Sequence, residues 1–376
     1  MAHSYYLGRS GSGKSTLLMQ HAIDAINAGE GLCFVDPHGD AVDTLLQFIP
    51  PRRRQDTILF DPTGDVVSFN PLDGIADIDQ TADALLYAFR DIWRFNDVST
   101  PTFDEYVLHA LLTLLQTKNP TLLGIVPLLT DEAYRAKLLD QIDDSFLLAF
   151  WGQFDAMSAK ERRDEIRSTK NKLNTMTIVR RKRRTLGQPR TAFSMADALT
   201  GKLLLIRLPQ GQLGINKTRL LGMLMLSQLH IATYTRETRE PFSVFIDEAH
   251  HFQGMALMEL LSGARKFGIE LHVSHQYLRQ LTPAMRDALI GNTTNRYIFR
   301  ISKADTEWLI EDDRSTKLIG YAYYELPRFM YRNGWNEITV EPLSEAPYPA
   351  RKTIEASRRQ YARPIGKIDL DLERNF

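Results

Sequence analysis

Short apolar runs alternate with amphipathic stretches over the first part of the chain. The runs at 4–7 (SYYL), 31–36 (GLCFVD) and 56–61 (DTILFD) have the length and apolar content of buried strands. Residues 14–28 carry apolar side chains at three- and four-residue intervals, which predicts a helix, and a shorter helix is expected at 42–48. This alternation is typical of a parallel sheet with crossover helices, so an α/β fold is predicted.

From residue 74 to residue 190 the strand pattern stops. Apolar residues there recur at three- and four-residue intervals, as in TADALLYAFRDIW and FDEYVLHALLTLLQ, which predicts helices only. Strand-like runs then return, with a long helix expected at 217–235. The predicted strands are GKLLLIRLP, PFSVFIDEAHHF, IELHVSHQ and NRYIFRI, followed by the short pieces YAYYEL and NEITVEP.

The chain is therefore expected to contain one large α/β core in two parts, residues 1–73 and 191–345. An all-α insertion at 74–190 separates the two parts, and residues 346–376 are expected to form a polar, basic tail. A length of 376 residues is sufficient for such a core with an inserted domain.

Composition adds few constraints. Lysine and arginine (46) balance aspartate and glutamate (46), so the net charge indicates no class of partner. The single cysteine, Cys33, lies in an apolar run, is expected to be buried in a strand and cannot form an internal disulfide, as in a reducing cytosol. No apolar run approaches the roughly 20 residues that a transmembrane helix needs. A cytoplasmic chain without a membrane segment is expected, with attachment to the cytoplasmic face of the inner membrane through partners or a removed anchor left open.

The segment Gly8–Ser15 (GRSGSGKS) fits the phosphate-loop pattern G-x-x-x-x-G-K-[ST]. Its glycines allow backbone N–H groups to turn toward phosphate oxygens, Lys14 is expected to reach the β and γ phosphates, and Ser15 can hold Mg²⁺. An apolar strand precedes the loop and an amphipathic helix follows it, as this motif requires. The expected nucleotide-binding residues are Gly8, Arg9, Ser10, Gly11, Ser12, Gly13, Lys14, Ser15 and Thr16.

A second acidic motif follows the apolar strand in FSVFIDEAHHF. Asp247 at the strand end suits a Mg²⁺ ligand acting through water, and Glu248 can orient and deprotonate an attacking water. The alternative is an acidic turn that caps the following helix. A DEAH-box helicase is disfavoured because such helicases need a second motor domain after this motif, whereas only about 130 residues remain here and their tail is not an αβ repeat. A chain with only one such core is expected to obtain the other part of its catalytic site from another subunit.

Two further residues are candidates for the same site. Gln276 ends the strand IELHVSHQ, and ligands of doubly wound sheets lie beyond the carboxyl ends of strands, so it is expected near the γ phosphate as a sensor. Arg265 precedes that strand and could stabilise transition-state charge at a neighbouring subunit's site. The alternatives are an ordinary polar residue at a strand end for Gln276 and a solvated residue near a helix C-terminus for Arg265.

The motifs GRSGSGKST, VDPHGD, FNPL, FIDEAHHF, ARKFGIELHVSHQ and ASRRQYARP together resemble the HerA/FtsK superfamily of P-loop DNA pumps. Within it the chain looks most similar to conjugative coupling proteins and related type IV secretion ATPases of the TraD/TraG kind. The resemblance spans nearly the whole sequence, since that family also has a RecA-like motor core interrupted by an all-α domain.

The resemblance implies a ring-shaped homohexamer that hydrolyses ATP with Mg²⁺ and moves DNA through a central channel. It makes Lys14 and Ser15 the Walker A pair, Asp247 and Glu248 the Walker B pair and Gln276 the sensor. It also favours Arg265 as the finger acting on the next subunit. Unlike typical coupling proteins the sequence has no N-terminal transmembrane pair, and unlike HerA it has no N-terminal β-barrel.

The basic run Arg180, Arg181, Lys182, Arg183 and Arg184 is the strongest local concentration of charge. Such a run can neutralise backbone phosphates without reading sequence, and a solvated helix end is the alternative. The resemblance to the HerA/FtsK superfamily favours DNA binding by this run. The histidines near the motifs match no structural zinc spacing.

The predicted function is that of an ATP-driven DNA translocase, in conjugative transfer by type IV secretion. Two alternatives remain: a secretion or pilus-assembly ATPase that acts on protein partners, and a HerA-like ATPase that works with a nuclease in DNA processing or phage defence. The expected partners are DNA, further copies of the chain, and either relaxase and secretion components or a nuclease.

Overall fold

The computed structural model describes residues 2–64, 66–75, 77–93, 100–177, 180–313, 328–331, 334–337 and 340–375. These residues form two compact units: a core unit, residues 1–60 and 195–359, and a helical unit, residues 61–194 and 360–376. No helix within the described ranges is both long enough and apolar enough to cross a membrane.

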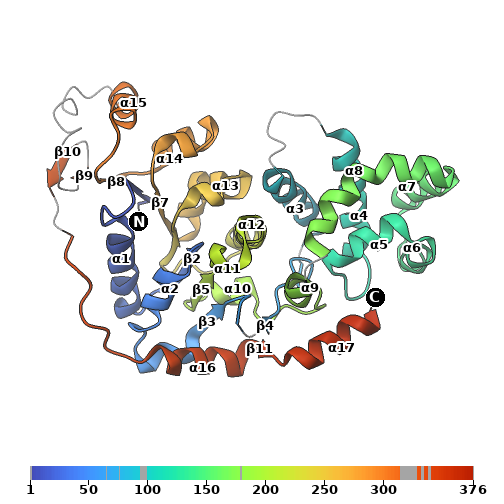
Figure 1. Cartoon of the computed structure of the whole chain (residues 1–376), viewed down its shortest axis with the longest axis horizontal. Helices are drawn as coiled ribbons and strands as arrows, with labels where there is room; N and C mark the ends of the chain where they lie inside the picture. The colour runs from blue at the N-terminus through green and yellow to red at the C-terminus, as the bar shows by residue number, and fades with distance from the viewer. Residues whose placement is uncertain are drawn as a thin grey trace. The chain divides into compact units, whose positions relative to one another are not determined.

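The core unit is built on one sheet, drawn in Figure 1, with the strand order β10-β9-β8-β1-β7-β6-β2-β5-β3. Its strands are β1 (Ser4–Leu7), β2 (Gly31–Asp36), β3 (Thr57–Phe60), β5 (Leu203–Arg207), β6 (Phe242–Ile246), β7 (Ile269–His275), β8 (Asn295–Ile298), β9 (Arg328–Tyr331) and β10 (Gly334–Glu337). The seven strands from β8 to β3 are parallel, and β9 and β10 extend the sheet antiparallel at one edge. The predicted α/β core with a mostly parallel sheet is confirmed. The predicted strand YAYYEL lies outside the described residues.

Helices cover both faces of this sheet (Figure 1). The helices α1 (Lys14–Ala28) and α2 (Asp40–Leu45) lie on one face, and α12 (Ile215–Tyr234), α13 (Met255–Gly263) and α14 (Pro283–Asn292) lie on the other. Leu18 and Ile26 of α1 are fully buried in a core shared with Phe34 of β2. Cys33 is buried in β2, as predicted. Apolar burial at about 25 cal/mol per Å² is the main source of stability in such a core.

The C-terminal stretch, expected as a polar, basic tail, contains regular structure. It forms α16 (Ala350–Tyr361), β11 (Ala362–Arg363) and α17 (Ile365–Asn375). Within the core unit, the Ser357 hydroxyl of α16 accepts a hydrogen bond from the backbone N–H of Leu59 at 2.8 Å. Since β3 is the last strand of the sheet, α16 covers an edge that would otherwise expose unpaired N–H groups.

The helical unit has its own core. Its helices are α3 (Ile78–Ile92), α4 (Pro101–Leu115), α5 (Ile125–Thr130), α6 (Glu132–Leu139), α7 (Ser145–Ala156), α8 (Ala159–Thr177), α9 (Arg180–Leu186) and α17. Trp151 of α7 is fully buried and donates its indole N–H to the Thr113 hydroxyl at 2.8 Å. The short strand β4 (Val66–Val67) pairs antiparallel with β11, which ties the end of the chain to this unit.

Because several histidines of the core unit are buried, we expect its folding stability to decrease as the pH falls. Burial lowers the pKa of His272 and His275 to about 3, and it lowers the pKa of His3 and His251 to about 4. Below pH 6.5 these histidines are therefore protonated in the unfolded chain but remain neutral in the folded chain. As the pH falls toward its folded pKa, each of them lowers the free energy of unfolding by up to about 1.4 kcal/mol per pH unit. The urea midpoint is expected to fall steadily between pH 7 and pH 5. A midpoint that stays constant over this range would contradict the burial of these imidazoles.

Candidate functional site

The topology of the sheet brings three loops to one edge. β7 lies between β1 and β6, and all three strands are parallel, so the segments that follow them meet at the carboxyl edge. The backbone N–H of Gly8, just after β1, points to the carbonyl of His275 at the end of β7, at 3.4 Å. Ligands of open α/β sheets bind beyond this edge.

The phosphate loop connects β1 to α1. Gly13 has a left-handed backbone with φ of 98°, which favours glycine, and it forms the N-cap of α1. A Cβ on Gly8 would lie only 2.4 Å from Cβ of Phe299, so the loop also needs glycine there. The free N–H groups at the start of α1 attract anions. Lys14 is buried and donates from Nζ to the carbonyl of Arg9 at 3.2 Å, while Arg9 and Ser10 are exposed.

Asp247 lies directly after β6 and is buried against the start of α1. The Ser15 hydroxyl donates to its Oδ2 at 3.0 Å, and the Ser274 hydroxyl donates to its Oδ1. Burial raises the pKa of Asp247, and the nearby Glu248 carboxylate raises it further, while the two hydroxyl donors oppose the rise. A positive charge at this position would therefore be stabilised.

The oxygen atoms around Asp247 fit Mg²⁺. This ion prefers oxygen donors and is usually held by one or two carboxylates together with substrate phosphates and waters. Ser15 and Asp247 provide a hydroxyl and a buried carboxylate next to the phosphate loop. Within the described residues no cluster of three or more histidine, cysteine, aspartate or glutamate side chains forms a metal site of its own.

Glu248 adopts an unusual backbone conformation next to Asp247. Its φ of 47° and ψ of 50° are left-handed, which costs a non-glycine residue about 1–3 kcal/mol and is typical of functional sites. Gln276 donates from Nε2 to Oε1 of Glu248 at 2.8 Å, and Nδ1 of His250 lies 3.3 Å from Oε2. Burial opposes ionisation of Glu248, but these two neighbours and the positive charge of Lys14 together lower its pKa to about 2.

The structure thus brings five of the predicted site residues to one place: Lys14, Ser15, Asp247, Glu248 and Gln276. Burial lowers the pKa of Lys14, and the two carboxylates oppose that shift, so the amine and the acids act on one another across the site. Sequence reasoning missed the roles of Ser274 and His250. A serine inside the apolar run of β7 was the available signal for the first of these.

Arg265 lies apart from this group. It is exposed in the turn Ala264–Phe267, which precedes β7, whereas the nucleotide site lies where β7 ends. A seven-residue strand at about 3.3 Å per residue separates the two ends of β7 by about 20 Å. Within one chain Arg265 therefore does not reach the phosphate loop, and its role at a neighbouring site remains a prediction.

The predicted DNA-binding run falls in α9 of the helical unit. Arg183 is exposed, but Arg184 forms a bidentate ion pair with Asp369 of α17, with both N–O distances 2.7 Å. The side chains of residues 180–182 lie outside the described residues. Arg184 thus has a structural role in holding α17 to α9, and the assignment of this run to DNA remains a prediction.

The acidic turn after β2 is also ordered by its own side chain. Asp36 is buried and accepts hydrogen bonds from the backbone N–H groups of His38 at 2.8 Å and Val42 at 3.0 Å. It therefore fixes the start of α2 next to the strand that carries Asp247.

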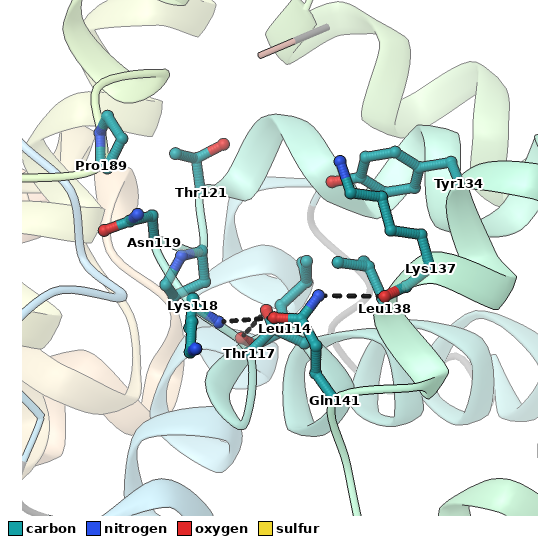
Figure 2. A pocket seen from close by; sticks show the side chains of 11 residues that line it. Leu114, Thr117, Lys118, Asn119, Thr121, Tyr134, Lys137, Leu138, Gln141 and Pro189 are labelled. Atoms are coloured by element: carbon teal, nitrogen blue, oxygen red, sulfur yellow. Dashed lines mark hydrogen bonds between the residues drawn. The ribbon is translucent and has the colours of Figure 1, made fainter.

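The helical unit contains a separate cavity of about 190 Å³ (Figure 2). Gln141 is one of the residues that line it: its Oε1 accepts from the backbone N–H of Lys118 at 3.2 Å and its Nε2 donates to the carbonyl of Lys137 at 3.0 Å. None of the predicted site residues lines this cavity.

A phosphate loop after the first strand of a parallel sheet, with an acidic pair at the same edge, defines the fold of a P-loop nucleoside triphosphatase. By sequence, comparison with protein families and with curated proteins gives no match. By structure, the chain is similar to the bacterial conjugative coupling protein TrwBdeltaN70 in its unbound form, with a TM-score of 0.65 and 17% identity over 93% of this chain and 87% of that one.

Two further solved structures have the same fold. TrwB in complex with ADP and Mg²⁺ has a TM-score of 0.58 and 17% identity over 94% of this chain and 79% of that one. VirB4 of Thermoanaerobacter pseudethanolicus has a TM-score of 0.62 and 15% identity over 91% and 89%. The fold that the resemblance to coupling proteins and type IV secretion ATPases implied is therefore confirmed.

Proposed function

We propose that this chain is an ATP-hydrolysing motor that moves DNA, and that it serves conjugative transfer by type IV secretion. The observation that carries the proposal is the 3.0 Å contact of Ser15 with Asp247, which joins the phosphate loop to the acidic pair. The similarity in fold to the coupling protein TrwB supports the choice of DNA as the cargo.

The chemistry follows from the residues at the carboxyl edge of the sheet. Backbone N–H groups of the phosphate loop and the Lys14 amine bind the phosphates of ATP. Mg²⁺ held by Ser15 and Asp247 would supply positive charge to the phosphate oxygens. Glu248 orients the attacking water and accepts its proton, and Gln276 contacts the γ phosphate.

The active assembly is proposed to be a homohexamer, with each nucleotide site completed by Arg265 of the next subunit. The hexamer is what the resemblance to the HerA/FtsK superfamily implies, and Arg265 is assigned to the next subunit because it is exposed and about one strand length from its own site. The motor is proposed to act in the cytoplasm, with relaxase or secretion components as its partners.

Steady-state hydrolysis tests the proposal directly. Purified chain at low salt is expected to hydrolyse ATP, and single-stranded or duplex DNA is expected to raise the rate by about tenfold or more, since DNA bound through backbone phosphates drives the motor cycle. Lys14→Ala should abolish hydrolysis under all conditions. The matched control is Lys266→Ala, which removes an exposed amine from the turn before β7, at the opposite end of this strand from the phosphate loop of the same chain.

The other outcomes distinguish the alternatives. Hydrolysis that is indifferent to both forms of DNA would overturn the DNA motor and favour an ATPase that acts on protein cargo in secretion or pilus assembly. Stimulation by DNA ends only, in the presence of a nuclease partner, would instead favour a role in DNA processing or defence.

A further inference from the structure

The loop that follows β7 is connected to Glu248 by a second path besides Gln276. Gln280 lies in this loop, and its side-chain Oε1 accepts hydrogen bonds from the backbone N–H groups of Gln276 and Tyr277, both at 3.1 Å. Two N–H donors fix which end of the Gln280 amide is oxygen. The amide nitrogen of Gln280 therefore points the other way, and it lies 3.4 Å from Nε2 of His250.

The orientation of Gln280 determines the tautomer of His250. An amide NH₂ group can only donate, so Nε2 of His250 accepts and the ring proton lies on Nδ1. Nδ1 is 3.3 Å from Oε2 of Glu248. Both atoms are buried, and within the described residues neither has a hydrogen-bond partner. The N–H of His250 thus lies 3.3 Å from the one carboxylate oxygen that Gln276 does not occupy, and a small rotation of either side chain would let it donate there.

The backbone around His250 is held as firmly as its ring. Gln253 donates from Nε2 to the carbonyl of His250 at 3.3 Å and to the carbonyl of Gln280 at 3.1 Å. Its Oε1 accepts from the backbone N–H of Thr282 at 2.8 Å. The segments that follow β6 and β7 are therefore linked through the side chain of Gln253.

We propose that His250 is a positioning residue that fixes Oε2 of Glu248, so that Oε1 is presented to the attacking water when Gln276 turns to the γ phosphate. The two carboxylate oxygens then have separate tasks. Oε2 stays bonded to the fixed path through Gln280, and Oε1 exchanges between Gln276 and water. This inference rests on the proposed hydrolysis of ATP and assigns a function to a residue outside the predicted site.

Two amide substitutions of His250 test this path. The side-chain nitrogen of asparagine can occupy the place of Nδ1, whereas the longer side chain of glutamine places its nitrogen near the position of Nε2. His250→Asn is expected to keep kcat within about threefold of the wild type, while His250→Gln and His250→Ala lower kcat by about tenfold or more. The dissociation constant of ATP should stay unchanged in all three, because His250 does not touch the phosphate loop.

This pattern separates positioning from a merely structural role. A structural role would lower kcat according to the loss of folding stability, so thermal midpoints are measured for the three variants. Equal losses of kcat in His250→Asn and His250→Ala would overturn the inference, as would a wild-type kcat in all three.

The tautomer provides a readout that does not depend on turnover. Nitrogen NMR of the histidine rings, with the His250 signal assigned by its absence in His250→Asn, is expected to show the proton of His250 on Nδ1. A proton on Nε2 would overturn the inference even if ATP hydrolysis were established. A wild-type chain that hydrolyses no ATP, with the Nδ1 tautomer present, would instead overturn the proposed function and leave the path from Gln280 to Glu248 standing.

Discussion

Glu248→Gln is expected to lower ATP turnover by a factor of about 10²–10⁴, the usual contribution of a general base. The substitution keeps the shape of the side chain, but the amide has one acceptor oxygen in place of two and cannot accept the proton of the attacking water. Nucleotide affinity should change by less than about threefold, because Glu248 acts on the water and not on the bound phosphates. Turnover is measured by phosphate release, and affinity by titration with a fluorescent ATP analogue.

Glu259→Gln is the matched control for this experiment. It makes the same chemical change at an exposed position of α13, the helix that follows the acidic motif. Its turnover is expected to equal that of the wild type. Unchanged turnover in Glu248→Gln would remove Glu248 from the role of base, and a matching loss of nucleotide affinity would mean that its contribution is to binding.

The elements around the phosphate loop were predictable because the local pattern and the tertiary environment agree there. The predicted strands SYYL and GLCFVD are β1 (Ser4–Leu7) and β2 (Gly31–Asp36) in the structure, with the same bounds. Strands buried on both faces appear in the sequence as continuous apolar runs, and both of these strands are buried at every position.

The C-terminal helices were not predictable in the same way. Polar residues dominate α16, and only a narrow face of it, including Thr353 and Ser357, is buried. Its packing depends on β3 being the edge strand, which follows from the order of the sheet rather than from the local sequence. The pairing of Arg184 with Asp369 joins residues far apart in the sequence, and the basic run alone did not indicate it.

The candidate site likewise contains residues that could be predicted from the sequence and residues that could not. Motif spacing predicted Lys14, Ser15, Asp247 and Glu248, because phosphate chemistry restricts which residue types can follow a strand. Spacing could not indicate that His250 and Gln280 would bond to one another, since that contact depends on β7 lying next to β6. Contacts such as this one, between residues that support the catalytic side chains, can be predicted only when the fold is known.

Arg265→Ala is expected to lower ATP turnover by a factor of about 10³–10⁵ in the assembled ring, the range measured for arginine fingers. The guanidinium would neutralise charge that develops on the γ phosphate of the next subunit. Arg265 is exposed at the amino edge of the sheet, so its loss should leave the folding of the chain and its own nucleotide site intact. Lys266→Ala removes an adjacent exposed cation and should have little effect.

Mixing two inactive variants tests whether Arg265 acts between subunits. Arg265→Ala subunits keep an intact phosphate loop, and Lys14→Ala subunits keep an intact arginine. In a mixed ring, an Arg265→Ala site beside a Lys14→Ala subunit has every required group, so the mixture should recover part of the wild-type turnover. A mixture with the double variant Lys14→Ala/Arg265→Ala should recover none. Recovery in neither mixture, with mixed rings verified by mass, would mean that Arg265 does not complete a neighbouring site.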